Sequence, residues 1–402
     1  LFVSFPKTLV RSDGYPSDQE IRALLGEDEY QYIWGTGQES IQLTYSFTSA
    51  STFQLDDAYA ESFGVYTDLL NLGFDSALDS GQFDPFFLGF NNGQKDWIRQ
   101  SLDDWGTACN IDFLEVDEVS SGSYGDIRFF GFDFVAFEEF FPGFIDGAAG
   151  FAYMPDYDGS DDALQGDVFL DSYYEPGDGF FEHLVAHEIG HAVGLSHPHD
   201  GLIDHPLNNS ESVMSYDEGH FLAITPMPAD IKATEFLYGD TQANTGDTTH
   251  NWSLGQLQTF RMSVVDDGGA DDSIDISNWQ PDASRSSMDS SGVGASINLS
   301  PDSWSSLSEN GVFNSDLNAS SSPSYTSNLA DWEYNFGQIY IAPDAVIENL
   351  IATNWSDVVF DNSSANEITL GDGNDNLFLS AGSDIAFGGE GEDTLVLNQE
   401  KQ

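Results

Sequence analysis

Residues 187–197 read HEIGHAVGLSH. His187 and His191 are four positions apart, so on a helix both imidazoles point from the same face, one turn from each other. This spacing suits two ligands of a single Zn²⁺ ion with nitrogen bonds of about 2 Å. The stretch therefore predicts a helix from about residue 179 to 193 that carries two zinc ligands.

The same stretch predicts the rest of a metal site. Glycine tolerates a positive φ, so Gly194 lets the helix end in a sharp turn that brings His197 back as a third ligand. Three protein ligands leave a position open for water, which is typical of a catalytic zinc site, and Glu188 is placed to act on that water as a general base. Ordinary helix histidines are the alternative. Chance produces a bare HExxH far more readily than this longer pattern.

A second short stretch lies 15 residues beyond His197, where residues 212–216 read SVMSY. Taken by itself, Met214 is a core residue and Tyr216 is an ordinary aromatic residue. Only the family resemblance described below makes them candidates for the same site.

The last part of the chain follows a nine-residue register. LGDGNDNLF (370–378), LSAGSDIAF (379–387) and GGEGEDTLV (388–396) share Gly at position four, Asp at position six and an apolar residue at position eight. A Gly/Asp-rich linker explains this composition but not its period, which is typical of a parallel β-roll with Ca²⁺ between successive turns. The repeat residues predicted at calcium sites are Gly371, Gly373, Asp375, Gly382, Asp384, Gly388, Gly389, Gly391 and Asp393.

Two preceding segments keep the period but lack the glycines. ATNWSDVVF (352–360) and DNSSANEIT (361–369) are therefore expected to form coils with weak calcium sites or none.

Charge and cysteine content restrict the classes of partner. The 402 residues include 69 acidic and 10 basic ones, a net charge of -59. Such a polyanion is repelled by nucleic acid and by anionic membranes, so neither nucleic-acid binding nor membrane insertion is expected. The acidity suits either a saline habitat or the binding of hard cations. The single cysteine, Cys109, excludes an intramolecular disulfide and is expected to be a small buried side chain.

Hydrophobic spacing predicts two domains, residues 1–242 and 243–402. Helical spacing is found over 17–33, over 94–106 with an end at Gly106, and over 229–238, and strand patterns lie between these helices. Helical periodicity disappears after about residue 242, and the Ser/Asn-rich stretch 284–328 predicts long surface loops. No segment has the apolar length of a membrane span, and no signal peptide is visible, as expected for a processed chain or another export route.

The two motif sets together resemble the serralysins, secreted bacterial zinc peptidases of the metzincin clan with a calcium-binding RTX domain. The segments that carry the resemblance appear in the family order: LTYSF (43–47), GDVFLDS (166–172), HEIGHAVGLSHP (187–198), SVMSYD (212–217), SVVDDGGADDSIDIS (263–277), INLSPDSW (297–304) and IYIAPDAVIENLIAT (339–353). The resemblance implies an α+β metzincin catalytic domain with a zinc-binding helix, followed by a C-terminal parallel β-roll (RTX) or β-sandwich domain.

The resemblance also implies an activity and a setting. The expected protein is a monomeric, secreted, extracellular endopeptidase with one catalytic zinc ion and several structural calcium ions. Its expected partners are polypeptide substrates and a proteinaceous inhibitor. The reaction implied has no covalent intermediate, and Glu188 passes protons between water and the leaving amine.

Further site residues follow from the resemblance alone. Met214 is expected beneath the zinc ion, and Tyr216 is expected to ligate zinc or to donate to the oxyanion. Substrate is expected to lie along strand 150–154, at Gly150, Ala152 and Tyr153. Additional calcium-site residues are expected at Asp266, Gly268, Asp272 and Asp275.

Two other classes of protein are compatible with parts of the pattern. A calcium-dependent adhesin or surface protein with a vestigial zinc site explains the repeats and the acidity, but it requires neither Glu188 nor Gly194 nor Tyr216. A non-peptidase zinc hydrolase, such as an amidase, uses the same metal chemistry on small substrates.

Overall fold

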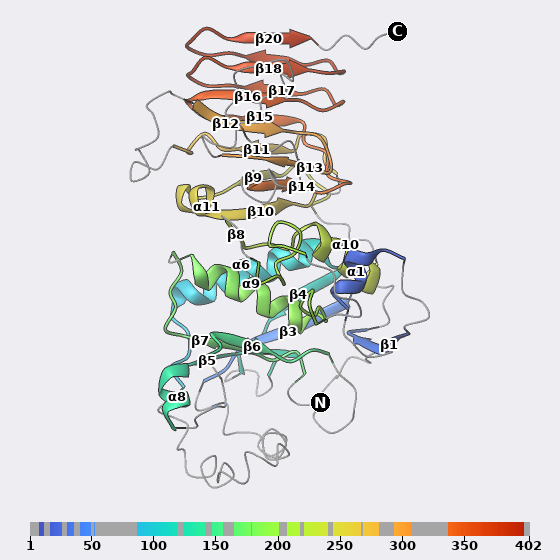
Figure 1. Cartoon of the computed structure of the whole chain (residues 1–402), viewed down its shortest axis with the longest axis vertical. Coiled ribbons are helices and arrows are strands. Elements are labelled where there is room, and N and C mark those ends of the chain that lie inside the picture. The colour runs from blue at the N-terminus through green and yellow to red at the C-terminus, as the bar shows by residue number, and fades with distance from the viewer. Residues whose placement is uncertain are drawn as a thin grey trace. The chain divides into compact units, whose positions relative to one another are not determined.

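The computed structural model (Figure 1) divides into two compact units. Unit 1 comprises residues 1–207 and 229–241, and unit 2 comprises residues 208–228 and 242–402. The domain limits expected at 1–242 and 243–402 stay a prediction. The residues that the structure describes are 8–11, 17–25, 30–35, 41–49, 52, 87–118, 124–140, 147–155, 165–177, 179–200, 207–217, 221–239, 244–266, 268–280, 293–307 and 337–397.

Unit 1 is built on a five-stranded sheet. Its strand order is β4 (Ile111–Glu115), β3 (Ile41–Phe47), β5 (Ile127–Phe132), β7 (Val168–Asp171) and β6 (Gly150–Ala152). The first four strands are parallel, and β6 runs antiparallel to β7 at the edge of the sheet. Strands β5 and β7 are buried throughout, as expected for parallel strands inside a sheet.

Two long helices pack together on this sheet. Helix α6 (Asn92–Ala108) contacts β4, while α9 (Phe180–Ala192) contacts β6 and β7, and the two helices contact each other. Figure 1 shows them side by side above the strands. The N-terminus of α6 is capped by Asn91, whose side chain accepts a hydrogen bond from the Gln94 N–H, 3.0 Å away. The sheet and α6 thus form the platform on which α9 lies.

Smaller elements complete unit 1. They are the antiparallel pair β1 (Thr8–Arg11) and β2 (Tyr30–Ile33), and the helices α1 (Gln19–Ala23), α8 (Phe134–Phe140) and α10 (Pro228–Tyr238). The buried thiol of Cys109 donates to the Trp105 carbonyl, 2.9 Å away, so the expectation of a small buried side chain is confirmed.

Two predicted helices differ from the observed ones. The helix expected over 17–33 is confined to α1, because Tyr30–Ile33 pairs with β1 as a strand instead. A long-range partner, which periodicity does not reveal, decides this segment. The helix expected to end at Gly106 continues to Ala108, and Cys109 is its C-cap.

Unit 2 is almost entirely β-structure. One sheet has the order β19 (Ile385–Phe387), β17 (Glu367–Thr369), β15 (Asn349–Ile351), β11 (Ser273–Asp275) and β9 (Thr249–Asn251). A second sheet has the order β12 (Val293–Asn298), β16 (Ser356–Phe360), β18 (Asn376–Leu379) and β20 (Thr394–Leu397). A third contains β13 (Ser303–Ser305), β14 (Ile339–Ile341), β10 (Phe260–Val264) and β8 (Leu222–Ala223), and α11 (Leu254–Thr259) precedes β10.

The repeat segments form coils that alternate between two of these sheets. Leu377 of β18 pairs in parallel with Leu395 of β20, and Ile368 of β17 pairs with Ala386 of β19. Each pairing joins residues 18 positions apart, so one coil contains two nine-residue repeats, one for each sheet. Figure 1 shows these strands stacked in succession toward the C-terminus.

Part of the Ser-rich stretch is ordered, contrary to expectation. Residues 293–305 form β12 and β13, and only the remainder of 284–328 lies outside the described residues or in turns. Buried Ala295 and Ile297 anchor β12 beside β16. The serines between the apolar residues find backbone partners, as Ser305 does with the Asn298 N–H, 3.0 Å away. Composition therefore misled the loop prediction.

Within the described residues, no helix has both the length and the apolarity needed to cross a membrane.

Candidate metal centre

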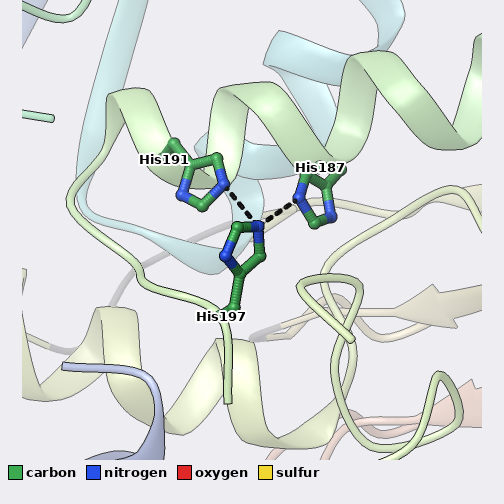
Figure 2. Close-up of side chains that lie close together, drawn as sticks. All are labelled: His187, His191 and His197. Carbon is green, nitrogen blue, oxygen red and sulfur yellow. Dashed lines mark hydrogen bonds between the residues drawn. The ribbon is translucent and has the colours of Figure 1, made fainter. Parts of the chain in front are cut away.

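Three imidazoles of unit 1 converge on one point. His187 and His191 project from one face of α9, and His197 reaches them from the loop that follows (Figure 2). The Nε2 atom of His197 lies 3.1 Å from the Nε2 atom of His187 and 3.1 Å from that of His191. Ligand atoms about 3.3 Å apart are expected around a tetrahedral ion with bonds of about 2 Å. The spacing of the three nitrogens fits zinc.

The hydrogen bonds of the Nδ1 atoms show whether the Nε2 atoms of His191 and His197 are protonated. Nδ1 of His191 lies 2.7 Å from the Leu195 carbonyl oxygen, which can only accept, so Nδ1 holds the proton of the neutral ring. Nδ1 of His197 lies 3.0 Å from Oδ2 of Asp200 and holds its proton for the same reason. The two Nε2 atoms then face each other with lone pairs, which repel unless a cation lies between them. This is the arrangement that a metal ion requires.

Burial keeps the rings in their metal-binding form. It lowers the pKa of His191 to about 3, with a smaller effect from neighbouring His197. The pKa of His197 is also lowered, again mainly by burial, while the hydrogen bond to Asp200 acts in the opposite direction. Neutral imidazole is the form that binds metals.

The turn after α9 has the geometry that the glycine predicts. Gly194 has a φ of 105°, which a residue with a side chain rarely adopts. The N–H of Leu195 bonds to the Gly190 carbonyl at 2.9 Å, and the N–H of Gly194 bonds to the His191 carbonyl at 2.8 Å. These two bonds define a Schellman motif. It reverses the chain within a few residues and returns His197 to the helix face.

Glu188 lies on α9 beside the first histidine and is buried. Its Oε2 atom has no hydrogen-bond partner among the described residues. Desolvation by burial raises the pKa of its carboxyl to about 8. A buried carboxylate with an unused oxygen needs a water molecule, a proton or a cation beside it.

Strand β6 lies directly against this glutamate. A Cβ atom at Gly150 would lie 3.1 Å from both Cγ and Oε1 of Glu188 and 3.0 Å from Cδ1 of Leu184. Such distances are shorter than ordinary van der Waals contacts, so a residue with a side chain at position 150 would displace the Glu188 side chain. The absence of a side chain at Gly150 therefore leaves room for the Glu188 carboxylate.

The pairing of β6 decides which of its backbone groups are available. Tyr153 donates to the Asp167 carbonyl at 3.0 Å and accepts from the Gly166 N–H at 2.9 Å, so its backbone is used within the sheet. In an antiparallel pair such residues alternate with residues that point away from the partner. Gly150 and Ala152 therefore direct their N–H and C=O groups to the side of β6 where the described residues form no further strand. Of the three residues expected to bind substrate, Tyr153 has only its side chain to offer.

The SVMSY segment belongs to unit 2. Met214 is fully buried there, and its N–H donates to Oγ of Ser212 at 3.0 Å. The side chain of Tyr216 is 62% exposed. Its expected role at the metal stays a prediction.

The remaining described histidines of unit 1 lie around the three ligand candidates. His183 is buried, and its ring centroid lies 5.9 Å from that of His187, so it lies next to a ligand candidate and not on the surface. His199 is exposed and stacks on His197 with ring centroids 5.2 Å apart.

Sequence reasoning missed Asp200. In the sequence, the only feature that marks it is its position three residues after His197. An acidic residue at that distance from a histidine is too common to predict a contact. His197, His199 and Asp200 also place ligand atoms within 4.8 Å of one another.

The residues expected to bind calcium lie in unit 2 in two settings. Asp375 accepts from the Asp357 N–H at 2.8 Å and Asp393 accepts from the Asp375 N–H at 3.2 Å, so each repeat carboxylate contacts the preceding coil. Asp384 likewise accepts from Asn366 at 3.1 Å. Positive φ is found at Gly268, Gly371, Gly373, Gly382, Gly389 and Gly391, but Gly388 is not among these residues.

The second setting lies near the start of the same stack. Asp272 accepts from the Thr248 N–H at 2.7 Å, Asp266 faces Nε2 of His250 at 2.9 Å, and Asp275 accepts from the Ser277 N–H at 3.0 Å. The described acidic residues of unit 2 form no close group of three carboxylates or imidazoles.

Comparison with known proteins supports a distant relationship. "Metallopeptidase AprA" of Pseudomonas marginalis is 25% identical over 316 residues, which cover 68% of this chain and 57% of that protein. "Metalloprotease AprA" of Pseudomonas entomophila (strain L48) is 28% identical over 231 residues, 48% of this chain and 45% of that protein. "Serralysin" of Proteus mirabilis is 29% identical over 231 residues, which cover 48% of this chain and 46% of that protein. No protein-family model matches the chain.

The chain is thus distantly similar to serralysin-type metalloproteases, and it spans about half the length of the curated relatives it matches.

Proposed function

We propose that the protein is a zinc-dependent endopeptidase of the serralysin type. The observation that carries this proposal is the convergence of three imidazole Nε2 atoms beside a buried glutamate and a strand that lies at the edge of the sheet formed by the described residues. The distant similarity to peptidases of that name supports the same conclusion. A vestigial zinc site in an adhesin would require neither the neutral ligand rings nor the glycine beside Glu188.

His187, His191 and His197 would hold the zinc ion. When bound, the ion supplies Lewis-acid activation of water and of the scissile carbonyl. The chain's contribution is orientation: the Leu195 carbonyl and the Asp200 carboxylate fix the proton on Nδ1 of two rings, so their Nε2 lone pairs point inward.

Glu188 would act as general base and then as general acid. Its buried carboxyl has a pKa of about 8, so it both accepts and releases a proton near neutral pH. A cation nearby lowers this pKa and favours the carboxylate that accepts the proton from water. Glu188 would then deliver that proton to the leaving amine.

Strand β6 would bind the substrate by edge addition. Gly150 and Ala152 have outward N–H and C=O groups, which can pair with an extended peptide as a further antiparallel strand. Polypeptides satisfy such a row of donors and acceptors, whereas a small amide satisfies at most one pair. This difference favours a peptidase over a small-amide hydrolase.

The SVMSY segment would complete the catalytic site. Met214 is proposed to form the floor beneath the metal, and Tyr216 to ligate zinc or to stabilise the oxyanion. The exposure of the Tyr216 phenol leaves it accessible to a ligand.

Unit 2 is proposed to be a calcium-stabilised RTX β-roll. Its coils of 18 residues, its tight glycine turns and the buried carboxylate of Asp375 support this proposal. A Cβ atom at Gly391 would collide with the Gly373 carbonyl oxygen, so the coils approach as closely as only glycine allows. We further propose that the protein is secreted, works outside the cell as a monomer, and is open to inhibition by a protein inhibitor.

The experiment is a cleavage assay on metal-analysed protein with casein, a quenched peptide and a small aromatic amide as substrates. We expect about one zinc ion bound per chain and cleavage of the two polypeptide substrates that a zinc chelator abolishes. Glu188→Gln should bind zinc as the parent does and lose about 10²–10⁴-fold in kcat. Exposed Glu139, exchanged in the same way, is the matched control and should retain full activity. Undiminished casein hydrolysis by zinc-loaded Glu188→Gln would overturn the proposal, and cleavage of the amide alone would assign a small-amide hydrolase.

A further inference from the structure

The C-terminal end of α9 has carbonyl groups that need hydrogen-bond donors from outside the helix. The last carbonyls of any helix lack N–H partners within it. At the end of α9, backbone N–H groups bond to the carbonyls of Ile189, Gly190 and His191. The Schellman turn therefore accounts for these three, and the next two carbonyls, those of Ala192 and Val193, need other donors.

Two aromatic side chains from distant parts of unit 1 supply those donors. The indole N–H of Trp34 donates to the Ala192 carbonyl at 2.9 Å, and the hydroxyl of Tyr238 donates to the Val193 carbonyl at 2.6 Å. Trp34 follows β2, and Tyr238 is the last residue of α10. Both side chains are buried. The two side chains thus donate to adjacent carbonyls of the same turn and brace it together.

The braced turn directly carries groups of the metal centre. The Leu195 carbonyl, two residues beyond Val193, orients Nδ1 of His191. The Ser196 N–H is held by the Leu24 carbonyl at 2.8 Å, and His197 follows at once. A shift of the turn would therefore move both the acceptor that orients one ligand and the backbone of another.

We propose that Trp34 and Tyr238 are positioning residues of the metal centre, which hold the turn after α9 so that His191 and His197 meet the same ion. The inference rests on the proposed function in taking these histidines as metal ligands. Without the two donors, buried carbonyls would seek other partners and the turn would shift. Neither side chain touches the ion or a substrate.

The test measures metal binding in the folded protein. Tyr238→Phe removes a single oxygen atom and should lower zinc affinity about tenfold, the lower limit for groups that support metal ligands. It should also alter the visible absorption of the Co²⁺-substituted protein, because that spectrum reports ligand geometry. Trp34→Phe should act in the same direction.

Trp105→Phe is the matched control for the tryptophan variant. Its indole is buried and its N–H donates to the carbonyl of Ala186 in α9 at 2.9 Å. That carbonyl lies inside α9, where it also accepts the regular helical hydrogen bond from the N–H four residues later in the chain. The control should lower the unfolding temperature as Trp34→Phe does and leave the cobalt spectrum and zinc affinity unchanged.

The inference is overturned if Tyr238→Phe lowers the unfolding temperature but keeps the parental zinc affinity and cobalt spectrum. Zinc uptake without any peptide hydrolysis by the parent would refute the proposed function alone, since affinity and spectrum still report the positioning.

Discussion

The histidine centre of unit 1 and the aspartate stack of unit 2 prepare for cations in opposite ways. At the histidine centre burial favours the neutral form of His191 and His197, and these two rings are oriented by a carbonyl and a carboxylate. In the stack, carboxylates lie one above another at intervals of 18 residues, and burial raises the pKa of Asp375 to about 7.

The difference follows from the charge of the ligands. Neutral imidazoles cost little to bring together, so packing and hydrogen bonds can hold them in place without an ion. Buried carboxylates repel one another and lose hydration, so a stack of them favours any partner that supplies positive charge. A site with neutral ligands can be organised before its metal binds, whereas a stack of carboxylates is completed by the cation.

Selective metal removal is the strongest test of this comparison. Chelation of calcium should remove hydrogen-exchange protection from the strands of unit 2, because the proposed calcium binding would be coupled to folding. Chelation of zinc should abolish peptide cleavage while α9 keeps most of its protection. Equal loss of protection in both units under both chelators would refute the distinction.

The pH dependence of unit 2 without metal sharpens the comparison. Asp357 accepts hydrogen bonds from the Ala295 N–H at 2.6 Å and the Thr353 N–H at 2.9 Å, yet burial raises its pKa from 3.8 to about 6. Between these two values the folded state binds more protons than the unfolded state, so stability falls as pH rises from about 4 to about 6. A decrease of about 3 kcal/mol is expected for one such buried group.

Urea unfolding of dialysed, metal-free protein at several pH values measures this effect. Asp357→Asn should flatten the pH dependence, because the amide does not titrate. Stability that rises with pH over the same interval in the parent protein would contradict the assignment.

A smaller effect is expected where β6 meets the glutamate. Gly150→Ala places a methyl group 3.1 Å from Oε1 of Glu188, so the carboxylate must move by a few tenths of an ångström. We expect kcat to fall about tenfold, since small displacements of a catalytic group are costly. Zinc content and the unfolding temperature should change little.

Ala149→Gly, one residue before Gly150, is the control because it removes atoms instead of adding them, and the Ala149 carbonyl pairs within the sheet. Its kcat should stay within about twofold of the parent value. A Gly150→Ala enzyme with full kcat would show that the space beside Glu188 is not needed.

The local motifs were readable because their chemistry depends on short spacings. One helical turn separates His187 from His191, and a glycine with positive φ follows, so an eleven-residue stretch defines most of the ligand set. Strands β3, β5 and β7 likewise lie between the predicted helices, where strand patterns were expected, since buried parallel strands are short apolar runs. Segment 30–33 was misassigned, because its state depends on pairing with β1.

The sequence by itself determined the residue types and spacings: three histidines and a glutamate within eleven residues, and a nine-residue repeat of glycine and aspartate. Only the tertiary structure decided that Trp34, Tyr238 and Asp200 support the metal centre, and that two repeats make one coil shared by two sheets. The reason is physical. A periodic pattern records contacts between near neighbours, whereas the donors that satisfy the end of α9 come from opposite ends of unit 1 and meet only when the chain has folded.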